Sequence, residues 1–486
     1  MIICNVREMK EFELHTRESL GISEIELMSR AGSKLVKDFI ERVKPNSKNN
    51  ITIFAGTGNN GGDALVMAIE LLKIGYKPDI FVVGDTPKAT DSFMHYYDLA
   101  GKINIISNAS ELEFYQEDIT NSDIIIDGIL GIGITREVTG YRSDLIKYIN
   151  DSDTVVYSID MPSGLNPENG IVLGIAVEAT YTGIVGFYKL GNLLHDALDY
   201  HGDSKVLDIG IIQKYPLNRS YIDINDYDLN LLRRKHNSNK YTFGLGVYVG
   251  GRKSMMGSIQ MSAMSGLKTG LGIAVVLSDL KDNIFTQFYP EIIVENNVGE
   301  DVMRLLNKAA CVVFGPGISV NNKDHREILN YLLDSNIPLL IDATGFKYLD
   351  LTKKYKNKNI VLTPHVGELA RMLAVKTEDI NKDSYKYIKK LTNKGFNVIL
   401  KGQCTIIATK DRVRYLQARN PGLGTAGSGD VLSGIVGAYL ATNDVFNAMV
   451  SGVVTHSRAG LIAKDNYGEI SLVASNIIDS IHQVLK

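Results

Sequence analysis

The feature that most constrains the fold of this chain is a repeated alternation of short apolar runs with helical stretches. Runs that are apolar on both faces and separated by helices predict parallel strands in a sheet covered on both sides. The alternation occurs in two blocks, so we expect two α/β units. The first block has runs at 51–54, 80–83, 124–126, 155–159 and 183–186, and the second at 245–249, 273–277, 311–314, 338–341, 360–362, 398–400, 405–408 and 413–416.

Helical spacing is clearest at 23–43, where apolar residues recur every three or four positions. Ser23 and Glu26 predict a capping box at the start of this helix. Further helical patterns cover 64–72 and 431–440. Each of these two follows a glycine-rich turn.

The segment 211–240 is polar and lacks periodicity, which is typical of a linker. A length of 486 residues predicts roughly two to four domains. We therefore expect one domain at 1–213, a linker at 214–235 and a second domain at 236–486.

Charge and composition exclude several classes of protein. The net charge of −3 argues against a nucleic-acid or membrane-surface binder. The sequence shows neither a signal peptide nor an apolar run of about 18 residues. Cys4, Cys311 and Cys404 are too far apart for a zinc motif and suit a reducing compartment. We expect a cytoplasmic protein with no nucleic-acid or membrane partner.

Gly56, Gly58 and Gly61 fit G-x-G-x-x-G, the dinucleotide-binding pattern, after the first apolar run. Asp85, at the end of the next run, lies about where a ribose-binding acid would occur. A nicotinamide dehydrogenase is therefore one hypothesis, and a tight turn without a ligand is another. Asp63 argues against the dehydrogenase, because its charge in the first helical turn would repel a pyrophosphate.

Two further polar motifs follow apolar runs, DGILGIG at 127–133 and DMPSG at 160–164. The carboxyl ends of parallel strands are where α/β sheets bind ligands. Side chains of Asn60, Asp127, Asp160 and Ser163 are therefore expected to converge there. Such an oxygen-rich set suits a hard cation better than a phosphate.

LMSRAG, GTGNNGGDALV, DGILGIG and DMPSGLNP together resemble the N-terminal YjeF domain, the NAD(P)H-hydrate epimerase, over about residues 20–212. The resemblance implies a Rossmann-like three-layer fold that interconverts the R and S forms of NADHX and NADPHX, the 6-hydroxy derivatives of the reduced cofactors. It implies a potassium site at Asn60, Asp127 and Ser163. The substrate contacts that it implies are Asn59, Asn60, Gly61, Gly62, Asp63, Gly131, Ile132, Gly133, Ile134, Thr135, Arg136, Glu137 and Asp160.

Within that resemblance, Asp127 is our candidate catalytic acid or base, because a nearby cation can tune a carboxylate. A turn-capping or purely metal-binding Asp127 is the alternative. Lys189 in GFYKLG matches the family's lysine, with a solvated lysine as its alternative. The chain has Ala64 where the family commonly has glycine.

The second glycine motif, TAGSGD at 425–430, precedes the helical pattern 431–440. Backbone N–H groups at such a turn attract an anion. The negative charge of Asp430 is unfavourable in a site that only binds phosphate, but the carboxylate would serve as a base for a hydroxyl group that attacks phosphorus. A helix-capping aspartate is the alternative.

GPG, TPHVGE, LKGQCT, NPG and AGSGDVLSG, in this order, resemble the ribokinase-like ADP-dependent NAD(P)H-hydrate dehydratase over about residues 236–486. The resemblance implies that the S hydrate and ADP give the normal cofactor, AMP and phosphate. It assigns catalysis to Asp430 and the hydrate to Gly317 and His365, while Thr344 departs from the family's usual aspartate. The nucleotide contacts that it implies are Lys401, Gly402, Gln403, Cys404, Thr405, Gly427, Ser428 and Gly429.

The leading hypothesis is therefore one bifunctional repair enzyme, with NADHX, NADPHX and ADP as its small-molecule partners. Potassium is expected at the epimerase site and Mg²⁺ at the dehydratase site, since phosphoryl transfer uses that ion. We also expect a homo-oligomer. The alternatives are a vitamin-type kinase of the ribokinase superfamily with an appended binding domain, and an N-terminal half that is a catalytically silent scaffold.

Overall fold

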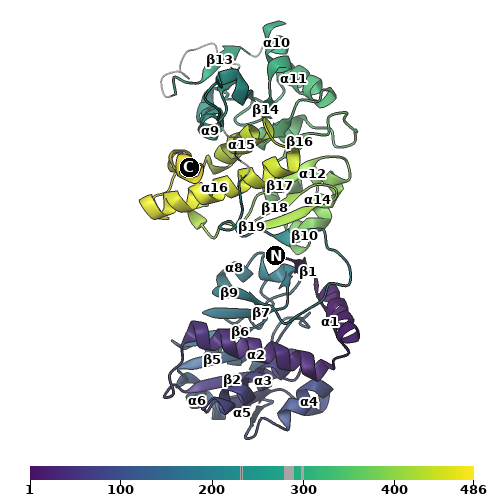
Figure 1. Ribbon diagram of the computed structural model, residues 1–486, viewed down its shortest axis with the longest axis vertical. Coiled ribbons are helices and arrows are strands. Elements are labelled where there is room, and N and C mark those ends of the chain that lie inside the picture. The colour runs from purple at the N-terminus through teal and green to yellow at the C-terminus, as the bar shows by residue number, and fades with distance from the viewer. Residues whose placement is uncertain (230, 232–233, 279–288, 297–299) are drawn as a thin grey trace. The chain divides into compact units, whose positions relative to one another are not determined.

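The computed structural model describes residues 1–229, 231, 234–278, 289–296 and 300–486. These residues divide into two compact units, Met1–Arg219 and Ser220–Lys486 (Figure 1). The division falls inside the polar segment 211–240. Part of the segment expected as a linker, β10 (Arg219–Tyr221), is an edge strand rather than an irregular stretch.

A parallel sheet of seven strands forms the centre of the first unit. All of its neighbouring strands pair in parallel, which confirms the sheet predicted from the apolar runs. Its order is β4 (Asn104–Ile106), β3 (Asp79–Val83), β2 (Ile51–Gly56), β5 (Ile124–Gly128), β6 (Val155–Ile159), β7 (Tyr181–Val185) and β9 (Asp203–Leu207).

Helices cover both faces of this sheet, which confirms the three-layer architecture. Alternate strand residues divide between two apolar clusters, with Ile53 in one and Phe54 in the other. The first cluster lies under α2 (Glu24–Val43), α3 (Asn59–Lys73) and α4 (Asp91–Tyr97), and the second under α5 (Ala109–Phe114), α6 (Gln116–Thr120) and α7 (Tyr141–Asp151).

Ser23 caps α2 as predicted, because its side chain accepts a hydrogen bond from the backbone N–H of Glu26. The reciprocal half of the capping box was wrong. The Glu26 carboxylate accepts instead from Arg30, one turn further along the helix. An exposed i,i+4 ion pair has replaced the second capping bond.

The N-terminal residues form an additional layer that the apolar runs did not predict. In this layer β1 (Ile3–Cys4) pairs in parallel with β8 (Tyr188–Lys189), and Cys4 lies opposite Lys189. Asn5 and Glu8 form a complete capping box at the start of α1 (Val6–Leu20). This pairing brings α1 beside the carboxyl ends of the sheet strands.

The second unit has a sheet of ten strands, in which the pairings from β13 through β17 are parallel, the β17–β18 and β18–β19 pairings are antiparallel, and β10 lies at the edge beside β19. Each predicted run of the second block corresponds to one of its strands, although Pro338, the first residue of the run 338–341, precedes β15. Its order is β10, β19 (Val413–Gln417), β18 (Cys404–Ala408), β17 (Asn397–Leu400), β16 (Ile360–Leu362), β15 (Leu339–Ile341), β14 (Cys311–Phe314), β11 (Leu245–Val249), β12 (Ile273–Ser278) and β13 (Ile293–Asn296).

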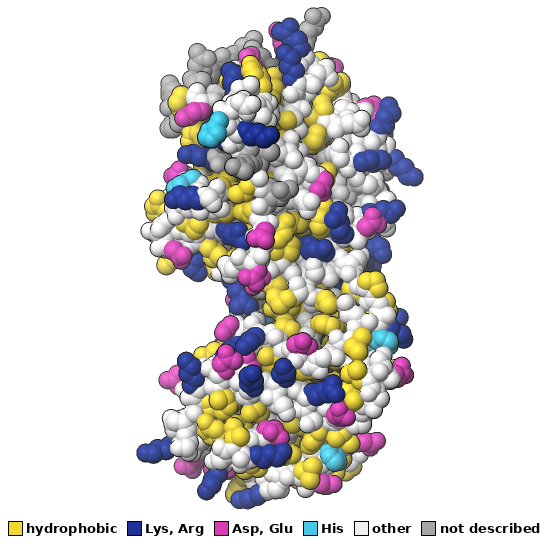
Figure 2. Space-filling view, viewed as in Figure 1, with side chains coloured by type: hydrophobic (Ala, Val, Ile, Leu, Met, Phe, Trp, Pro, Cys, Tyr) yellow, Lys and Arg dark blue, Asp and Glu magenta, His cyan; other side chains and the backbone are white. Residues whose placement is uncertain are grey.

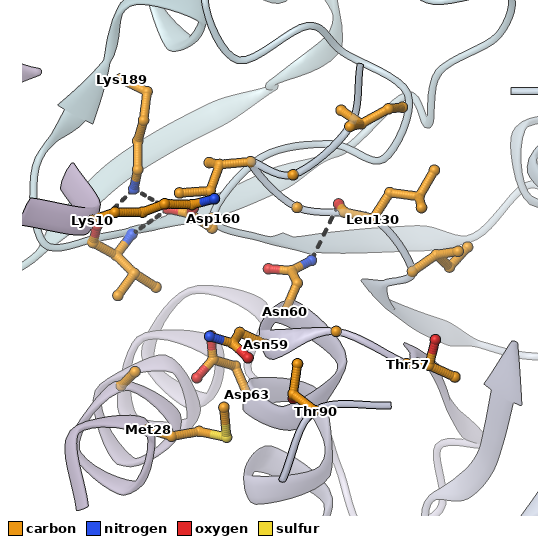
Figure 3. A pocket seen from close by; sticks show the side chains of 18 of the residues that line it. Lys10, Met28, Thr57, Asn59, Asn60, Asp63, Thr90, Leu130, Asp160 and Lys189 are labelled. Atoms are coloured by element: carbon orange, nitrogen blue, oxygen red, sulfur yellow. Dashed lines mark hydrogen bonds and ion pairs between the residues drawn. The ribbon is translucent and has the colours of Figure 1, made fainter. Parts of the chain in front are cut away.

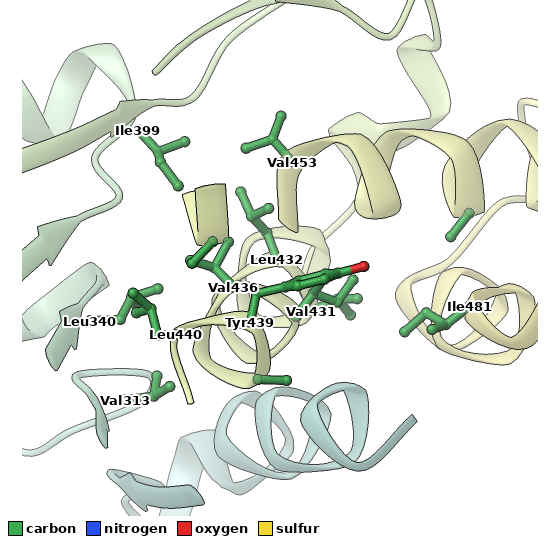
Figure 4. Packing of buried hydrophobic residues seen from close by; sticks show 14 of the residues in the cluster. Val313, Leu340, Ile399, Val431, Leu432, Val436, Tyr439, Leu440, Val453 and Ile481 are labelled. Atoms are coloured by element: carbon green, nitrogen blue, oxygen red, sulfur yellow. The ribbon is translucent and has the colours of Figure 1, made fainter. Parts of the chain in front are cut away.

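One apolar cluster joins a face of this sheet to α9 (Met256–Lys268), α15 (Ser428–Leu440), α16 (Val445–Tyr467) and α17 (Ala474–Val484) (Figure 4). Gly434 permits a close approach of α15 to α9, because a Cβ there would lie 1.9 Å from the Ser262 carbonyl oxygen. The approach holds the N-terminus of α15 in place. The connecting helices are α10 (Glu300–Lys308), α11 (Lys323–Asp334), α12 (Val366–Leu373), α13 (Thr377–Lys382) and α14 (Ser384–Thr392).

Surface charge is mixed on the face shown in Figure 2, where lysine and arginine side chains alternate with aspartate and glutamate. This pattern agrees with the small net charge of −3. Among the described helices, none combines the length and apolar content that crossing a bilayer requires.

Candidate functional site

The first unit contains a cavity of about 890 Å³ at the carboxyl ends of its strands (Figure 3). Its walls come from the start of α3, the loop 129–139 after β5, the loop after β6, the strand β8 and helix α1. Parallel α/β sheets place ligands at this edge. The position agrees with the site expected from the three polar motifs.

Close packing accounts for two glycines of the turn between β2 and α3. A Cβ at Gly61 would lie 1.7 Å from the Gly56 carbonyl oxygen, and one at Gly56 would lie 1.9 Å from that of Ile129. Gly58 lines the cavity, and a Cβ there would meet nothing within 4 Å. The motif thus brings the helix start against the β5 loop and leaves the backbone open to a ligand.

A buried ion pair joins Asp160 and Lys189 at one end of the cavity (Figure 3). The side chain of Lys189 is 1% exposed and that of Asp160 is 11% exposed. Lys189 Nζ also donates to the Val185 carbonyl at 2.7 Å, and Asp160 accepts from the Val185 N–H at 2.9 Å. Each buried charge therefore has a charged partner and a backbone partner.

Asp127, by contrast, has a side chain that the cavity does not reach. It is fully buried, and its oxygens accept from Ser158 Oγ at 2.8 Å, Ser163 N at 2.9 Å, Ser163 Oγ at 2.5 Å and Ile129 N at 3.2 Å. Burial raises the pKa of Asp127, although the hydrogen bonds from Ser163 and Ser158 oppose that rise. These bonds join the loops that follow β5 and β6.

The three residues expected to bind potassium do converge, around the backbone of Leu130. Asn60 Nδ2 and Ser163 Oγ each donate to the Leu130 carbonyl at 3.2 Å. Ser163 in turn contacts Asp127. Amide, hydroxyl, carbonyl and carboxylate oxygens therefore lie within one small region beside the cavity.

In the second unit, Asp430 lies in the first turn of α15, after the glycine turn. Its pKa is raised to about 6, mainly by burial and also by the nearby Asp342 carboxylate, while a hydrogen bond from Ser258 opposes the rise. A carboxylate with this pKa is a stronger base than an ordinary aspartate and is still ionised at neutral pH.

Lys401 supplies the positive charge of this region. Its Nζ lies 2.9 Å from Asp342 Oδ1 and 3.8 Å from Glu368 Oε2. A Cβ at Gly429 would lie 3.3 Å from the same nitrogen, so the ammonium group lies against the start of α15. The predicted nucleotide residues Lys401 and Gly429 are thus brought together, beside two carboxylates that were not among the predicted site residues.

The remaining predicted residues of the second unit occupy varied positions. His365 is the exposed N-cap of α12, and Glu368 closes its capping box. Gly317 has a φ of 63° and accepts from the Arg252 N–H at 2.7 Å, which joins the loops after β14 and β11. The predicted nucleotide role of Cys404 is restricted to its backbone, because its thiol is buried and burial raises its pKa to about 12. Gly402 and Gln403 are exposed, Thr405 is half-buried, and Gly427 and Ser428 begin α15.

Comparison with known proteins adds an independent observation. The model of the YjeF-related protein N-terminus matches residues 24–191, and that of NAD(P)H-hydrate dehydratase matches residues 247–483. The bifunctional NAD(P)H-hydrate repair enzyme of Coxiella burnetii is 30% identical over 491 residues, which cover 98% of each chain. This chain belongs to the bifunctional NAD(P)H-hydrate repair enzyme family.

Other members of that family match over comparable lengths. The repair enzyme of Thermofilum pendens is 28% identical across 100% of this chain and 96% of its own. A solved structure of an ADP/ATP-dependent NAD(P)H-hydrate dehydratase from Bacillus subtilis, co-crystallized with ATP/Mg²⁺, is 22% identical, with a TM-score of 0.47. It covers 52% of this chain and 93% of that one.

For a repair enzyme of this family, the cavity lining shows which predicted substrate contacts have direct access. Gly61 and Gly62 lie outside the lining, because the first packs on Gly56 and the second on Met28. We therefore assign both glycines to packing instead of substrate contact. The predicted residues that do line the cavity are Asn59, Asn60, Asp63, Gly131, Ile132, Gly133, Ile134, Thr135, Arg136, Glu137 and Asp160.

Helix α1 contributes a wall of the repair enzyme's cavity that was not predicted from the sequence. Lys10, Glu13 and Arg17 all line it from this helix. The available signal was the Asn5–Glu8 capping pattern followed by buried residues at helical spacing. It did not show that the helix would reach the strand ends, which depends on the pairing of β1 with β8.

Proposed function

We propose that this chain epimerises the R and S forms of NAD(P)HX in its first unit and dehydrates the S form in its second, at the expense of ADP. Membership of the repair family supports this proposal, because both family models match in order along one chain. The observation that carries it is the presence of two separate acid–base centres, Asp160–Lys189 and Asp430, each at the carboxyl ends of a parallel sheet.

For the epimerase centre we assign the acid–base role to Asp160 with Lys189 instead of Asp127. Inversion at a carbon that bears a hydroxyl group needs a residue that reaches the substrate to move a proton. Asp160 and Lys189 line the cavity, whereas Asp127 is sealed behind four hydrogen bonds. Asp127 then positions Ser163 and the β5 loop.

Potassium fits the oxygen set beside that centre. Ser163 Oγ, the Asp127 carboxylate and the Leu130 carbonyl are oxygen donors of the kind that alkali and alkaline-earth cations prefer, and Asn60, whose Nδ2 contacts that carbonyl, would add its amide oxygen after a flip of the amide group. Asp127 is fully buried and forms no ion pair with any residue that the structure describes, which is costly, and the charge of a bound ion would offset that cost. When bound, the ion would stabilise the anionic Asp127 and the loop that forms one cavity wall.

For the dehydratase centre, Asp430 removes the proton of the C6 hydroxyl group while the oxygen attacks the terminal phosphorus of ADP. AMP leaves, and the hydroxyl group becomes a phosphate ester. Phosphate then departs with the electron pair of the C–O bond as the ring nitrogen supplies its lone pair to C6, and loss of a proton from C5 to solvent forms the C5–C6 double bond and returns the lone pair to nitrogen, which gives the normal cofactor. Lys401 and the N–H groups at the start of α15 stabilise charge on the phosphate oxygens.

Magnesium would be held mainly by the nucleotide's phosphates in this centre. The described residues contain no cluster of three or more acidic, histidine or cysteine ligands suited to a metal. Glu368, three residues after His365 at the start of α12, and Asp342 are the nearby carboxylates that can complete its shell. The ion would neutralise phosphate charge when it is bound.

A product analysis tests the second half of this proposal. With hydrated NADH and ADP, we expect AMP and inorganic phosphate to appear together with NADH. A vitamin-type kinase would instead use ATP and give a stable phosphorylated product with no AMP. Stable phosphorylation of the substrate would contradict the dehydratase assignment.

The subcellular location and the oligomeric state of the protein are further parts of the proposal. We place the protein in the cytoplasm, since its three cysteines are all free and buried. The expected homo-oligomer stays a prediction, and sedimentation of the purified chain would test it.

A further inference from the structure

Two partly buried carboxyl groups in the epimerase cavity have no partner among the residues that the structure describes. Glu13 on α1 and Asp63 on α3 both line the cavity. Neither forms a hydrogen bond or ion pair with any residue that the structure describes, whereas Asp160 has Lys189 and Glu24 has Arg17. Asp63 lies on the helix below the opening in Figure 3, with Asp160 and Lys189 above it. Carboxyl groups left open to a cavity are available to a ligand.

Burial is the main reason that Glu13 titrates near neutral pH, where it can both donate and accept a proton. Its pKa is raised to about 7, mainly by burial. The positive charges of Lys189 and Arg17 lower the pKa, and the carboxylates of Asp160 and Glu24 raise it. Burial likewise raises the pKa of Asp63, and the charges of Asp160 and Glu13 raise it further. The other charged groups that line the cavity are Lys10, Arg136, Glu137 and Arg142.

Epimerisation at C6 makes two demands on such a cavity. The departing hydroxyl group needs a proton on one face of the ring, and the water that adds to the other face must lose one. A single acid–base pair on one wall serves only one of these positions at a time. Helix α1 supplies a second wall, distinct from the loop that carries Asp160.

We propose that Glu13 is a second catalytic acid–base residue of the epimerase, which acts from the α1 wall while Asp160 acts from the β6 loop. The proposal rests on the epimerase function proposed for this cavity. The Glu13 carboxyl group protonates the C6 hydroxyl group, the C6–O bond breaks, and the ring-nitrogen lone pair forms an N1–C6 double bond. Water then adds to the other face, the electron pair returns to nitrogen, and Asp160 takes the proton of the added water. The reverse inversion uses the same groups in opposite roles, and exchange with solvent resets their protons.

Substitution of Glu13 with glutamine tests this role. In Glu13→Gln we expect kcat for R-to-S exchange to fall about 100-fold, with little change in KM. The wild-type pH profile should contain an ionisation near pH 7 that the variant lacks. Glu13→Asp should restore part of the rate and the ionisation. The matched control is Glu18→Gln, an exposed position on the same helix that should behave as wild type.

The outcomes separate the role of Glu13 from that of the whole cavity. A Glu13→Gln enzyme with wild-type kcat overturns the proposal, as does one whose kcat falls while the ionisation near pH 7 remains, since that result indicates a structural role. Unfolding midpoints of both Glu13 variants show whether α1 is still docked. If the wild-type chain fails to exchange R and S at all, the epimerase function itself is wrong, which is a different failure.

Discussion

The two sites share a plan but differ in how they neutralise charge. Each begins with a glycine turn, a helix N-terminus and acidic residues at the carboxyl ends of parallel strands. In the first, Asp160 has Lys189 to itself, and both side chains are buried. In the second, Lys401 lies among Asp342, Glu368 and Asp430. Burial is the main cause of the raised pKa of Asp430 and the Asp342 carboxylate adds to it, while Lys401, which lies among three carboxylates, offsets only part of the rise.

Removal of the Asp430 carboxylate should have the largest effect. We expect Asp430→Asn to slow dehydration of the S hydrate about 1,000-fold, because general-base catalysis is lost. Exchange of R and S should continue at the wild-type rate. Release of AMP from ADP measures the first activity and chiral separation of the hydrates the second. Asp411→Asn, an exposed aspartate of the same unit, is the control. A variant that retains dehydration would remove Asp430 from the mechanism.

Removal of Lys189 should be costly to stability. Lys189→Met leaves the Asp160 carboxylate buried beside the cavity without its cation, and loss of one partner from a buried pair costs about 3–5 kcal/mol. Urea unfolding at neutral pH should show this loss. Lys401→Met should cost less, because the Lys401 side chain is 21% exposed. Equal losses in the two variants would contradict the contrast drawn between the sites.

The pH dependence of dehydration should show the effect of the shared lysine. Asp430 acts as a base, so its rate contribution is lost as the pH falls through its raised pKa of about 6. Lys401 lowers that pKa, and its removal in Lys401→Met should therefore move the midpoint to higher pH. A midpoint near pH 4 in the wild type, the ordinary value for aspartate, would show that the carboxylate is not shifted.

Exchange of the alkali cation should have the smallest effect. Replacement of potassium by lithium in the buffer should slow R–S exchange several-fold and leave the intrinsic dehydration of S unchanged, because Asn60 and Ser163 lie only at the first site. Ser163→Ala should reduce this cation dependence. An exchange rate that is indifferent to the cation would argue against the potassium proposal.

Much of this comparison could be predicted from the sequence. The apolar runs at 155–159, 245–249 and 360–362 are the strands β6, β11 and β16, because fully buried parallel strands are apolar throughout. The edge strands β4, β9 and β10 were missed, since they are short and only partly buried. A pattern search detects burial on both faces, which edge strands lack.

The site was harder to predict because side-chain direction at a strand end depends on one or two residues. Asp127 is the fourth residue of β5 and lies between covering layers, whereas Asp160 follows the last residue of β6 and reaches the cavity. In the sequence, both are simply aspartates at the ends of predicted strands, so their different side-chain directions could not be predicted. The position of Glu13 at the cavity could not be predicted for another reason, because only the pairing of β1 with β8 brings its helix there.

The most direct test of the central claim is the fate of the separated R hydrate with ADP in wild type and in Asp160→Asn. Asparagine keeps the side-chain shape and tolerates the φ of 62° found at this position. The account predicts that the wild type converts both hydrates to NAD(P)H, and that the variant converts S at the wild-type rate while R is consumed only as fast as it epimerises without enzyme. Rapid conversion of R by the variant would contradict the claim that the first unit epimerises at Asp160 and supplies the second.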